Sequence, residues 1–466
     1  MKNLIDQFYD VISSITDAPN LFIEAAGYFL ISTLCGKNVR SKLSSSPYEL
    51  SANDWFMITG SPGVTRKSVV IGHTKRIQKE VLRRVLRKNL MRRDPEDDRP
   101  IITIINEVVG STIIENATPQ GLLDHLTSTH EFTPFYSIIA PEFGGIIDQV
   151  KEAKYMSGYQ SLLSSLYTGE GYSQRMASTE KVKDKYVSRK RDIPENLYVT
   201  ALFGMQEPKK YLDASFIEQG LLRRIILLNY EKRERSLPFL DTRRGGQGDD
   251  ELQILKELKS QIYEKTIEYY NVGKILVDPI PGSIAGKINN QSNEFEKKYT
   301  KSKSLIDLYR YTMGEHLLKL TMINAIASRS PKQSVDYGYL HLQIEEEDYQ
   351  KAWNFLSAVL EKSETAISAI GTKHRERDYV EVKGTLEFVE SIVKSYKDGI
   401  TVKQLINDTN QYSYNLMKII ETLIKAGRII PVEKRSSDST LYLYHSKFEG
   451  TLSGEPINPA LLESYW

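Results

Sequence analysis

The architecture of this chain follows from one short stretch, WFMITGSPGVTRKS, which runs from Trp55 to Ser68. Its first five residues have the length and the apolar character of a buried strand. A glycine-containing loop comes next, and apolar residues at helical spacing predict a long helix from Lys67 to Arg93. Glycines let backbone N–H groups turn toward an anion, and a helix N-terminus adds partial positive charge. A strand, a glycine loop and a helix that opens with Lys-Ser therefore predict a phosphate-binding loop.

The polar residues of this loop have expected roles. Lys67 would reach the β and γ phosphates of a nucleotide, and Ser68 would offer its hydroxyl to Mg²⁺. The loop departs from the pattern G-x-x-x-x-G-K-[ST], because Lys67 lies one residue too far from Gly60 and Arg66 stands in place of the last glycine. An ordinary loop with a chance Lys-Ser is the alternative. The expected nucleotide contacts are Gly60, Ser61, Pro62, Gly63, Val64, Thr65, Arg66, Lys67 and Ser68.

Short apolar runs and helical patterns alternate on both sides of this loop. Two helices are expected before it, at 4–15 and 19–35, and a third after it, at 118–126. The further expected strands are residues 100–105, 135–140, 196–203 and 222–228. Buried strands that alternate with helices indicate an α/β domain with a mostly parallel sheet.

Carboxyl ends of two of these strands supply candidate catalytic groups. Glu142 follows the strand at 135–140 and is placed to polarise an attacking water. Pro141 stands where an aspartate usually directs Mg²⁺, which leaves Ser68 as the main protein ligand of the metal. Gln206 follows the strand at 196–203 and is a candidate to sense the γ phosphate or to hold the water. A surface carboxylate and a plain loop glutamine are the alternatives.

Two adjacent arginines precede the last expected strand of the domain. Arg223 and Arg224 follow Gly220-Leu221-Leu222. An arginine at such a position can reach the ATP of a neighbouring subunit and neutralise transition-state charge. Either residue fits this role, and Arg224 is favoured. A pair of surface arginines that only aids solubility is the alternative.

The second half of the chain is mostly helical. Residues 245–250 are rich in glycine and are expected to be flexible, and helices are expected at 252–270, 292–310, 315–327 and 346–366. A charged linker is expected at 373–377. Beyond it, helices at 384–394, 400–409 and 412–426 precede a hairpin formed by residues 429–432 and 441–444. This is the order of a helix-turn-helix followed by a wing.

The order of these motifs resembles that of a known group of proteins. In addition to residues 60–68, the resemblance uses Ala117 to Leu123, Glu142 to Gly145, Ser165 to Gly169, Gly204 to Pro208 and Gly220 to Arg224. Together they resemble the P-loop (RecA/AAA+ class) replicative helicase-like ATPases of plasmids and viruses. The layout is also similar to minichromosome-maintenance-type helicases with a C-terminal winged helix. The resemblance covers roughly residues 15–365.

The resemblance implies an ATP- and Mg²⁺-dependent DNA translocase or helicase that acts as a homo-oligomeric ring, usually a hexamer in this group, in the replication of a mobile element or virus. The chain departs from this group at Pro141, where the group usually has an aspartate. The implied domains are an N-terminal helical segment (1–50), a P-loop ATPase core (51–245), a helical lid region (246–372), a winged-helix domain (379–447) and a tail (448–466).

The charge of the chain is balanced as a sum and uneven as a distribution. There are 62 Lys plus Arg and 60 Asp plus Glu, for a net charge of +2. Nevertheless, residues 75–93 hold nine basic side chains against Glu80 alone, and residues 181–191 hold six against Asp184. Such clusters bind the phosphate backbone of nucleic acids through counterion release. A solvated helix face and a basic surface loop are the respective alternatives.

The second cluster is the preferred DNA-tracking element, because ring helicases of the resembling type insert a β-hairpin there that points into the central channel. Residues 177–190 have hairpin-like spacing. The expected winged helix is a further candidate for DNA contact, and winged helices that bind protein are the alternative. The expected DNA contacts are Lys181, Lys183, Lys185, Arg189 and Lys190 in the hairpin, and Lys418, Lys434 and Arg435 in the winged helix.

Other features of the sequence narrow the class of protein. The single cysteine, Cys35, excludes an intrachain disulfide framework and a multi-cysteine zinc site. No signal peptide and no membrane span are expected, which predicts a cytoplasmic protein. Two other functions remain open beside the helicase: an ATP-binding replication initiator or loader, and a DNA-binding regulator with a degenerate nucleotide site.

Overall fold

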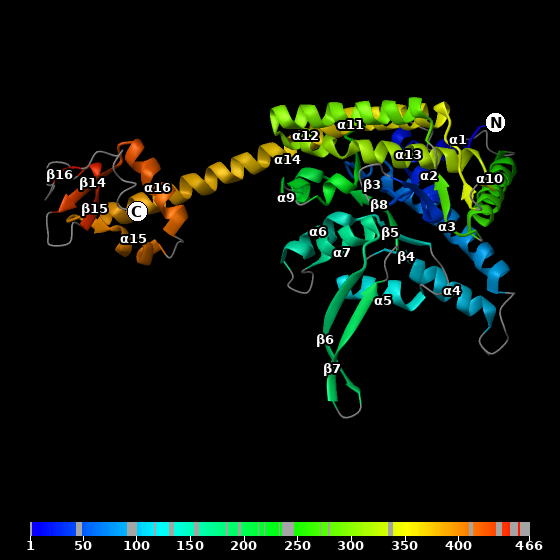
Figure 1. Ribbon diagram of the computed structural model, residues 1–466, viewed down its shortest axis with the longest axis horizontal. Coiled ribbons are helices and arrows are strands. Elements are labelled where there is room, and N and C mark those ends of the chain that lie inside the picture. Colours follow the sequence, from blue (N-terminus) through cyan, green and yellow to red (C-terminus); the bar gives the residue numbers. More distant parts are fainter. Residues whose placement is uncertain are drawn as a thin grey trace. The chain divides into compact units, whose positions relative to one another are not determined.

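The structure is a computed structural model of the chain (Figure 1). It describes residues 2–42, 49–90, 100–115, 118–129, 135–152, 158–182, 185–193, 197–212, 214–218, 220–232, 234, 247–270, 272–277, 280–333, 339–409, 413–434, 440–447 and 455–456. These residues form two compact units, Met1–Gly371 and Thr372–Trp466. The boundary falls within one long helix, α14 (Glu346–Ser395).

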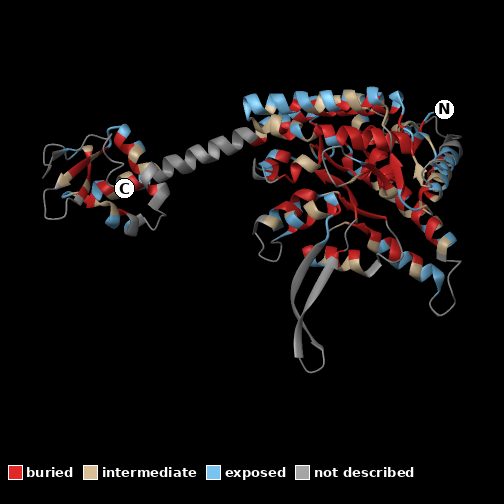
Figure 2. Ribbon diagram, viewed as in Figure 1, coloured by how far each residue is buried: buried red, intermediate tan, exposed pale blue. Residues whose placement is uncertain are grey.

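A five-stranded sheet forms the centre of the first unit. Its strands stand in the order β4-β5-β8-β3-β9, and every neighbouring pair is parallel. The bounds are β3 (Trp55–Gly60), β4 (Ile113–Ile114), β5 (Tyr136–Ala140), β8 (Val199–Met205) and β9 (Ile226–Tyr230). All residues of β3, β5 and β8 are buried (Figure 2), as expected for a sheet covered on both faces. The predicted α/β fold with a mostly parallel sheet is confirmed.

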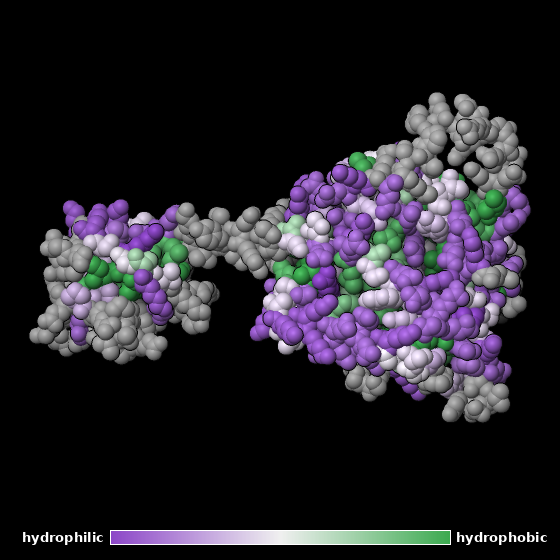
Figure 3. Space-filling model, turned by 90° about the horizontal axis from the view of Figure 1, so that it is seen from above, coloured by the Kyte–Doolittle hydropathy of each residue, from purple (hydrophilic) through white to green (hydrophobic). Residues whose placement is uncertain are grey.

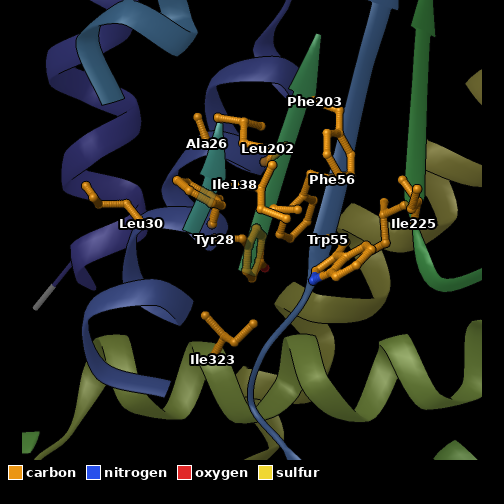
Figure 4. Close-up of a cluster of buried hydrophobic side chains, with 14 of the residues drawn as sticks. Ala26, Tyr28, Leu30, Trp55, Phe56, Ile138, Leu202, Phe203, Ile225 and Ile323 are labelled. Atoms are coloured by element: carbon orange, nitrogen blue, oxygen red, sulfur yellow. The ribbon is translucent and has the colours of Figure 1, made fainter. Parts of the chain in front are cut away.

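Helices from both halves of the unit cover this sheet. The apolar helix α2 (Asn20–Cys35) packs against β3, β8, α1 (Leu4–Ile15), α3 (Lys67–Leu90) and α13 (Met313–Ser328). Both α2 and α13 are buried nearly all round, which explains why neither has a polar face in the sequence. Figure 4 shows side chains that meet in this core: Ala26, Tyr28 and Leu30 of α2, Trp55 and Phe56 of β3, Ile138, Leu202 and Phe203 of neighbouring strands, and Ile323 of α13.

The remaining elements of the first unit are shorter or lie farther from the central sheet. A second sheet has the order β11-β12-β10-β1-β2. Its strands are β1 (Val39–Lys42), β2 (Glu49–Ser51), β10 (Ile275–Val277), β11 (Lys332–Gln333) and β12 (Leu340–His341). The other helices are α4 (Ile101–Thr112), α5 (Pro119–Thr129), α6 (Phe143–Glu152), α7 (Tyr159–Thr168), α8 (Pro208–Tyr211), α9 (Ala214–Glu218), α10 (Gln247–Tyr270), α11 (Gly282–Ser302) and α12 (Leu305–Tyr311), with 3₁₀ turns at Gly36–Asn38 and Leu222–Arg224.

The prediction of a strand at residues 100–105 is wrong, because this segment belongs to helix α4. Ile101 and Ile102 are exposed, whereas Ile105, Val108 and Val109 are buried, which is a helical repeat. A short apolar run does not distinguish a buried strand from a helix by its composition.

Several other expected boundaries are also corrected. Residues 222–224 form a 3₁₀ turn, so the strand expected at 222–228 begins at Ile226. The helix expected at 292–310 is two helices, because Lys303 has φ +48° and ends α11. The flexible segment expected at 245–250 contains the start of α10 at Gln247. The linker expected at 373–377 lies within α14, consistent with the high helix propensity of its Lys, Arg and Glu residues.

An antiparallel hairpin forms a separate two-stranded sheet in the first unit. It consists of β6 (Tyr172–Val182) and β7 (Lys185–Ile193), and its pairing shifts register between Arg175 and Thr179. In Figure 1 the two strands extend away from the parallel sheet. The expected hairpin at 177–190 is therefore present and is longer than expected at both ends.

The second unit has a small core of its own, in which Val389 and Val393 of α14 pack with Leu405, Leu416 and Ile420. Its helices are α15 (Val402–Thr409) and α16 (Ser413–Lys425), and Gly427 at φ +68° follows α16. Its sheet has the order β13-β15-β14-β16, with β13 (Ile400–Thr401), β14 (Ile429–Lys434), β15 (Thr440–His445) and β16 (Glu455–Pro456). The face of the first unit shown in Figure 3 carries mostly hydrophilic residues.

Candidate functional site

The glycine loop leaves the carboxyl end of β3, between the ends of its two neighbours in the sheet. The Gly60 N–H donates to the Gln206 carbonyl at the end of β8, at 3.1 Å. A Cβ on Gly60 would lie 2.3 Å from the Tyr230 carbonyl oxygen of β9 and 2.7 Å from Cγ2 of Thr65. Only glycine fits here, so the loop is held where parallel sheets bind their ligands.

Lys67 is the first residue of α3, and its side chain folds back over the loop. The Nζ atom donates to the Gly60 carbonyl oxygen at 3.3 Å, and the residue is only 5% exposed. Burial lowers the pKa of Lys67, and the negative charge of Glu142 acts in the opposite direction. The amine therefore lies over the loop within electrostatic range of Glu142, which two separate sequence motifs had predicted to share a site.

Arg66 has a backbone conformation that ordinarily belongs to glycine. Its φ is +52°, in the left-handed region, and it stands where the loop pattern has its last glycine. The Arg66 carbonyl accepts from the N–H groups of Val69 and Val70, at 3.0 and 3.3 Å, and so begins α3. Its Nε donates to Oδ1 of Asp17 at 3.2 Å, which ties the loop to the segment between α1 and α2. The loop backbone thus has the conformation expected of glycine, although Arg66 stands at this position.

Ser68 lies in the first turn of α3 and is exposed. The N–H groups of Lys67 and Ser68 precede any intrahelical acceptor, so they are available to an anion. The Ser68 hydroxyl is one hard oxygen donor, which suits Mg²⁺ when phosphate oxygens and water supply the rest of its shell. Gly63 at φ +68° leaves open space where a Cβ would stand, which leaves room beside the loop.

Glu142 is exposed immediately after β5, at the same edge of the sheet as the loop. Strand β8 lies between β5 and β3, and Gly204 of β8 accommodates the chain that leads to Glu142. A Cβ on Gly204 would lie 2.4 Å from the Pro141 carbonyl oxygen. Pro141 therefore lies directly over β8, and Glu142 follows it. The side chain of Gln206 is half-buried at this edge, and its sensing role remains a prediction.

Arg223 and Arg224 lie at the amino ends of the strands, whereas the glycine loop lies at their carboxyl ends. In the parallel register of β3 and β9, Phe56 pairs with Ile226, so the two arginines precede the amino end of β9. The strand β3 separates them from the loop by about 17 Å, at about 3.3 Å for each residue. Nη1 of Arg224 donates to the Gly220 carbonyl at 2.8 Å. Neither arginine is therefore placed to act on a nucleotide held by Lys67 of the same subunit.

No pattern in the sequence pointed to the polar groups behind these arginines. His316 of α13 contacts Oδ1 of Asp54 through Nδ1 at 2.7 Å and the Arg223 carbonyl through Nε2 at 3.0 Å. Burial alone lowers the pKa of His316, but the charge and hydrogen bond of Asp54 outweigh it and raise the pKa above its ordinary value. Asp17 was missed in the same way. These partners are brought together only by the tertiary fold.

The structure describes the backbone of most of the expected DNA contacts. Lys181 lies on β6, and Lys185, Arg189 and Lys190 lie on β7. Lys418 lies on α16 and Lys434 ends β14, whereas Lys183 and Arg435 are outside the described residues.

The other basic cluster, in the distal half of α3, is partly neutralised. Lys75 forms an ion pair with Glu115, and Arg84 with Glu80, which also pairs with Lys259. Arg76, Arg87 and Lys88 remain exposed.

Comparison with known proteins identifies no family for the chain. No protein-family model matches the sequence, and no curated protein matches it significantly. Within the described ranges, no three His, Cys, Asp or Glu residues gather as a metal-binding group. No helix among the same residues combines the length and the apolar character needed to cross a membrane.

Proposed function

We propose that this chain is an ATP-dependent DNA translocase or helicase with a P-loop core of the RecA/AAA+ class. The observation that carries the proposal is the position of Lys67: its amine lies 3.3 Å from the Gly60 carbonyl, over a loop at the carboxyl edge of a parallel sheet. A cation and free helix N–H groups at this place match the charge of a nucleotide triphosphate.

The residues around the loop supply the parts that phosphoryl transfer to water requires. Lys67 would neutralise charge on the β and γ phosphates, and Ser68 would hold Mg²⁺, which bridges phosphate oxygens. Glu142 would orient and deprotonate the attacking water from the end of β5. An exposed carboxylate within electrostatic range of a lysine, both at the carboxyl ends of the strands, has the charge arrangement for this role.

The arginines favour an oligomeric enzyme. Because Arg223 and Arg224 are about one strand length from the loop of their own subunit, they would serve a nucleotide bound by a neighbour. Head-to-tail contacts of this kind generate rings when the rotation closes. We therefore propose a homo-oligomeric ring, a hexamer, with ATP at the subunit boundaries.

Two elements support a DNA partner. The hairpin β6–β7 carries Lys181, Lys185, Arg189 and Lys190 and would follow the phosphate backbone in the ring channel. In the second unit, α15 and α16 followed by β14 and β15 have the order of a winged helix. We propose that this unit contacts duplex DNA and that the hairpin contacts single strands.

A second function is favoured by the departures in the loop. Arg66 in a glycine-like conformation and Pro141 in place of an aspartate are the changes expected of a degenerate nucleotide site. The alternative is therefore a DNA-binding regulator, or an initiator or loader, that hydrolyses ATP slowly or not at all.

ATP hydrolysis stimulated by single-stranded DNA distinguishes these functions. The Lys67→Ala variant should lose hydrolysis. The matched control is Lys287→Ala, which removes an exposed lysine of α11 that pairs with Glu346 of α14, and it should retain hydrolysis. Displacement of a strand from a forked duplex separates a helicase from a loader. Deletion of residues 179–191 should abolish unwinding and spare basal hydrolysis. A wild-type protein that neither hydrolyses ATP nor assembles in its presence would exclude a motor.

A further inference from the structure

A buried aspartate–histidine pair lies inside the first unit, at the amino ends of the strands and therefore opposite the glycine loop. Asp54, just before β3, is fully buried, and His316 is 1% exposed. Oδ1 of Asp54 lies 2.7 Å from Nδ1 of His316. The Arg223 carbonyl can only accept, so Nε2 of His316 carries the proton in that 3.0 Å contact. The imidazole therefore bridges the start of β3 and the backbone of the arginine turn.

Helices α12 and α13 hold the same turn at three further points. The Thr312 hydroxyl donates to the Arg223 carbonyl at 2.9 Å. The Tyr309 hydroxyl donates to the Ile225 carbonyl at 3.1 Å and accepts from the Leu227 N–H at 2.9 Å. Thr312, His316 and Tyr309 thus fix the backbone on both sides of Arg224, and little freedom remains for residues 223–227.

The arginines that this backbone carries have no acidic counter-charge among the described residues. The backbone contact of Arg224 is to Gly220, whose φ of +88° brings its Cα close: a Cβ there would lie 2.8 Å from Nη1 of Arg224. Burial and then the charge of Arg224 lower the pKa of Arg223. Two adjacent guanidinium groups that lack a carboxylate partner are suited to an external anion.

We propose that Asp54, His316 and Thr312 are positioning residues, which hold the Arg223–Arg224 turn rigid so that it meets the nucleotide phosphates of a neighbouring copy. This inference rests on the proposed ATPase function. A buried ion pair is a weak source of stability, because desolvation offsets the attraction of its charges. A fixed backbone turn, by contrast, already has the conformation that presents its arginines, so it loses little backbone freedom when they meet the transition state.

Mixing of variants tests this inference in the full-length protein. His316→Leu retains Lys67 and would misplace the arginines, whereas Lys67→Ala lacks a working loop but retains a correct arginine turn. Each variant alone should hydrolyse ATP roughly 10²-fold more slowly than wild type or worse. An equal mixture should recover about a quarter of the wild-type rate, because that share of random head-to-tail contacts joins an intact loop to an intact turn.

Two further measurements exclude a general structural defect. The affinity of His316→Leu for a fluorescent ATP analogue should stay within about twofold of wild type, because the loop lies about 17 Å away. The control variant is Asn324→Ala. Asn324 is buried on the same helix as His316, but it contacts Tyr28 and the Asp348 carbonyl instead of the turn. This variant should retain wild-type hydrolysis.

The outcomes separate this inference from the proposed function. An inactive wild-type protein refutes the ATPase itself and the inference with it. With an active wild type, full activity of His316→Leu, or a mixture that recovers nothing, overturns the positioning role alone. If His316→Leu does not fold, Asp54→Asn and Thr312→Val, which preserve side-chain shape, take its place in the same mixing assay with the same expected recovery.

Discussion

Arg66 provides a quantitative test of the loop geometry. A left-handed backbone costs a residue with a Cβ about 1–2 kcal/mol, and glycine escapes this cost. Arg66 has φ +52°, so it carries this strain, and its half-exposed ion pair with Asp17 returns only about 0.5 kcal/mol. Arg66→Ala keeps the strain and loses the ion pair, so it should destabilise the protein by about 0.5 kcal/mol.

Arg66→Gly has a different balance. It loses the same ion pair, relieves the strain, and gives the unfolded chain about 0.4–1 kcal/mol more conformational freedom. The sum is near zero, so the glycine variant should be more stable than the alanine variant by about 0.5–1 kcal/mol. Because Lys67 and the helix N–H groups are unchanged, we also expect nucleotide affinity within about threefold of wild type.

Urea unfolding followed by tryptophan fluorescence, to which the buried Trp55 of β3 contributes, measures this difference. The midpoint of Arg66→Gly should lie about 0.3 M above that of Arg66→Ala. Arg87 is the matched control, because it is exposed inside α3, where glycine should be about 1 kcal/mol less stable than alanine. Equal stability of the two Arg66 variants, or the same order of variants at both sites, would refute the assigned backbone conformation.

Three other changes have defined outcomes. Gly204→Ala places a methyl group against the Pro141 carbonyl, so it should lower the rate of ATP hydrolysis more than nucleotide affinity, as a comparison of kcat with Kd would show. Burial raises the pKa of Glu24 to about 7, so wild-type stability falls as pH rises above the unfolded value of 4.5. Glu24→Gln should therefore stabilise the protein by up to about 3 kcal/mol at pH 8 and very little at pH 5 in urea titrations; a gain that does not depend on pH contradicts this. The pKa of His316 is raised, so the stability that it contributes is complete below pH 6.5 and is lost as pH rises through the folded value. The stability difference between wild type and His316→Gln should shrink from pH 6 to pH 9, and a constant difference would show that the pair with Asp54 is uncharged.

The sequence predicted correctly those strands in which every residue is apolar or small and buried. The strands β3, β5 and β8 are uniformly buried, as expected from their continuous apolar runs. Helix α4 was misjudged, because Ile101 and Ile102 make a helical segment look like a strand although both are exposed. The end of α11 was not predicted, because it depends on one left-handed residue, Lys303. The length of α14 was not predicted either, because the charged run expected to be a linker continues the helix.

The candidate site divides along the same line. Lys67 and Ser68 were identifiable because the glycine loop and the helix start are contiguous in the chain. Asp54 and His316 are 262 residues apart, and nothing in the local pattern of either residue announces the other. The partner of Arg66 was equally hidden, since Asp17 lies on a segment that meets the loop only after folding.

By itself, the sequence determined a parallel α/β sheet and a glycine-containing loop between its first long strand and a helix, because strand burial and loop composition are local properties. Only the tertiary structure decided the order of the strands, which places β8 between the loop and Glu142. It also placed Arg223 and Arg224 at the edge away from Lys67, because parallel register depends on long-range pairing. The left-handed backbone of Arg66 and its ion pair with Asp17 belong to this second group, since the two residues meet only after folding.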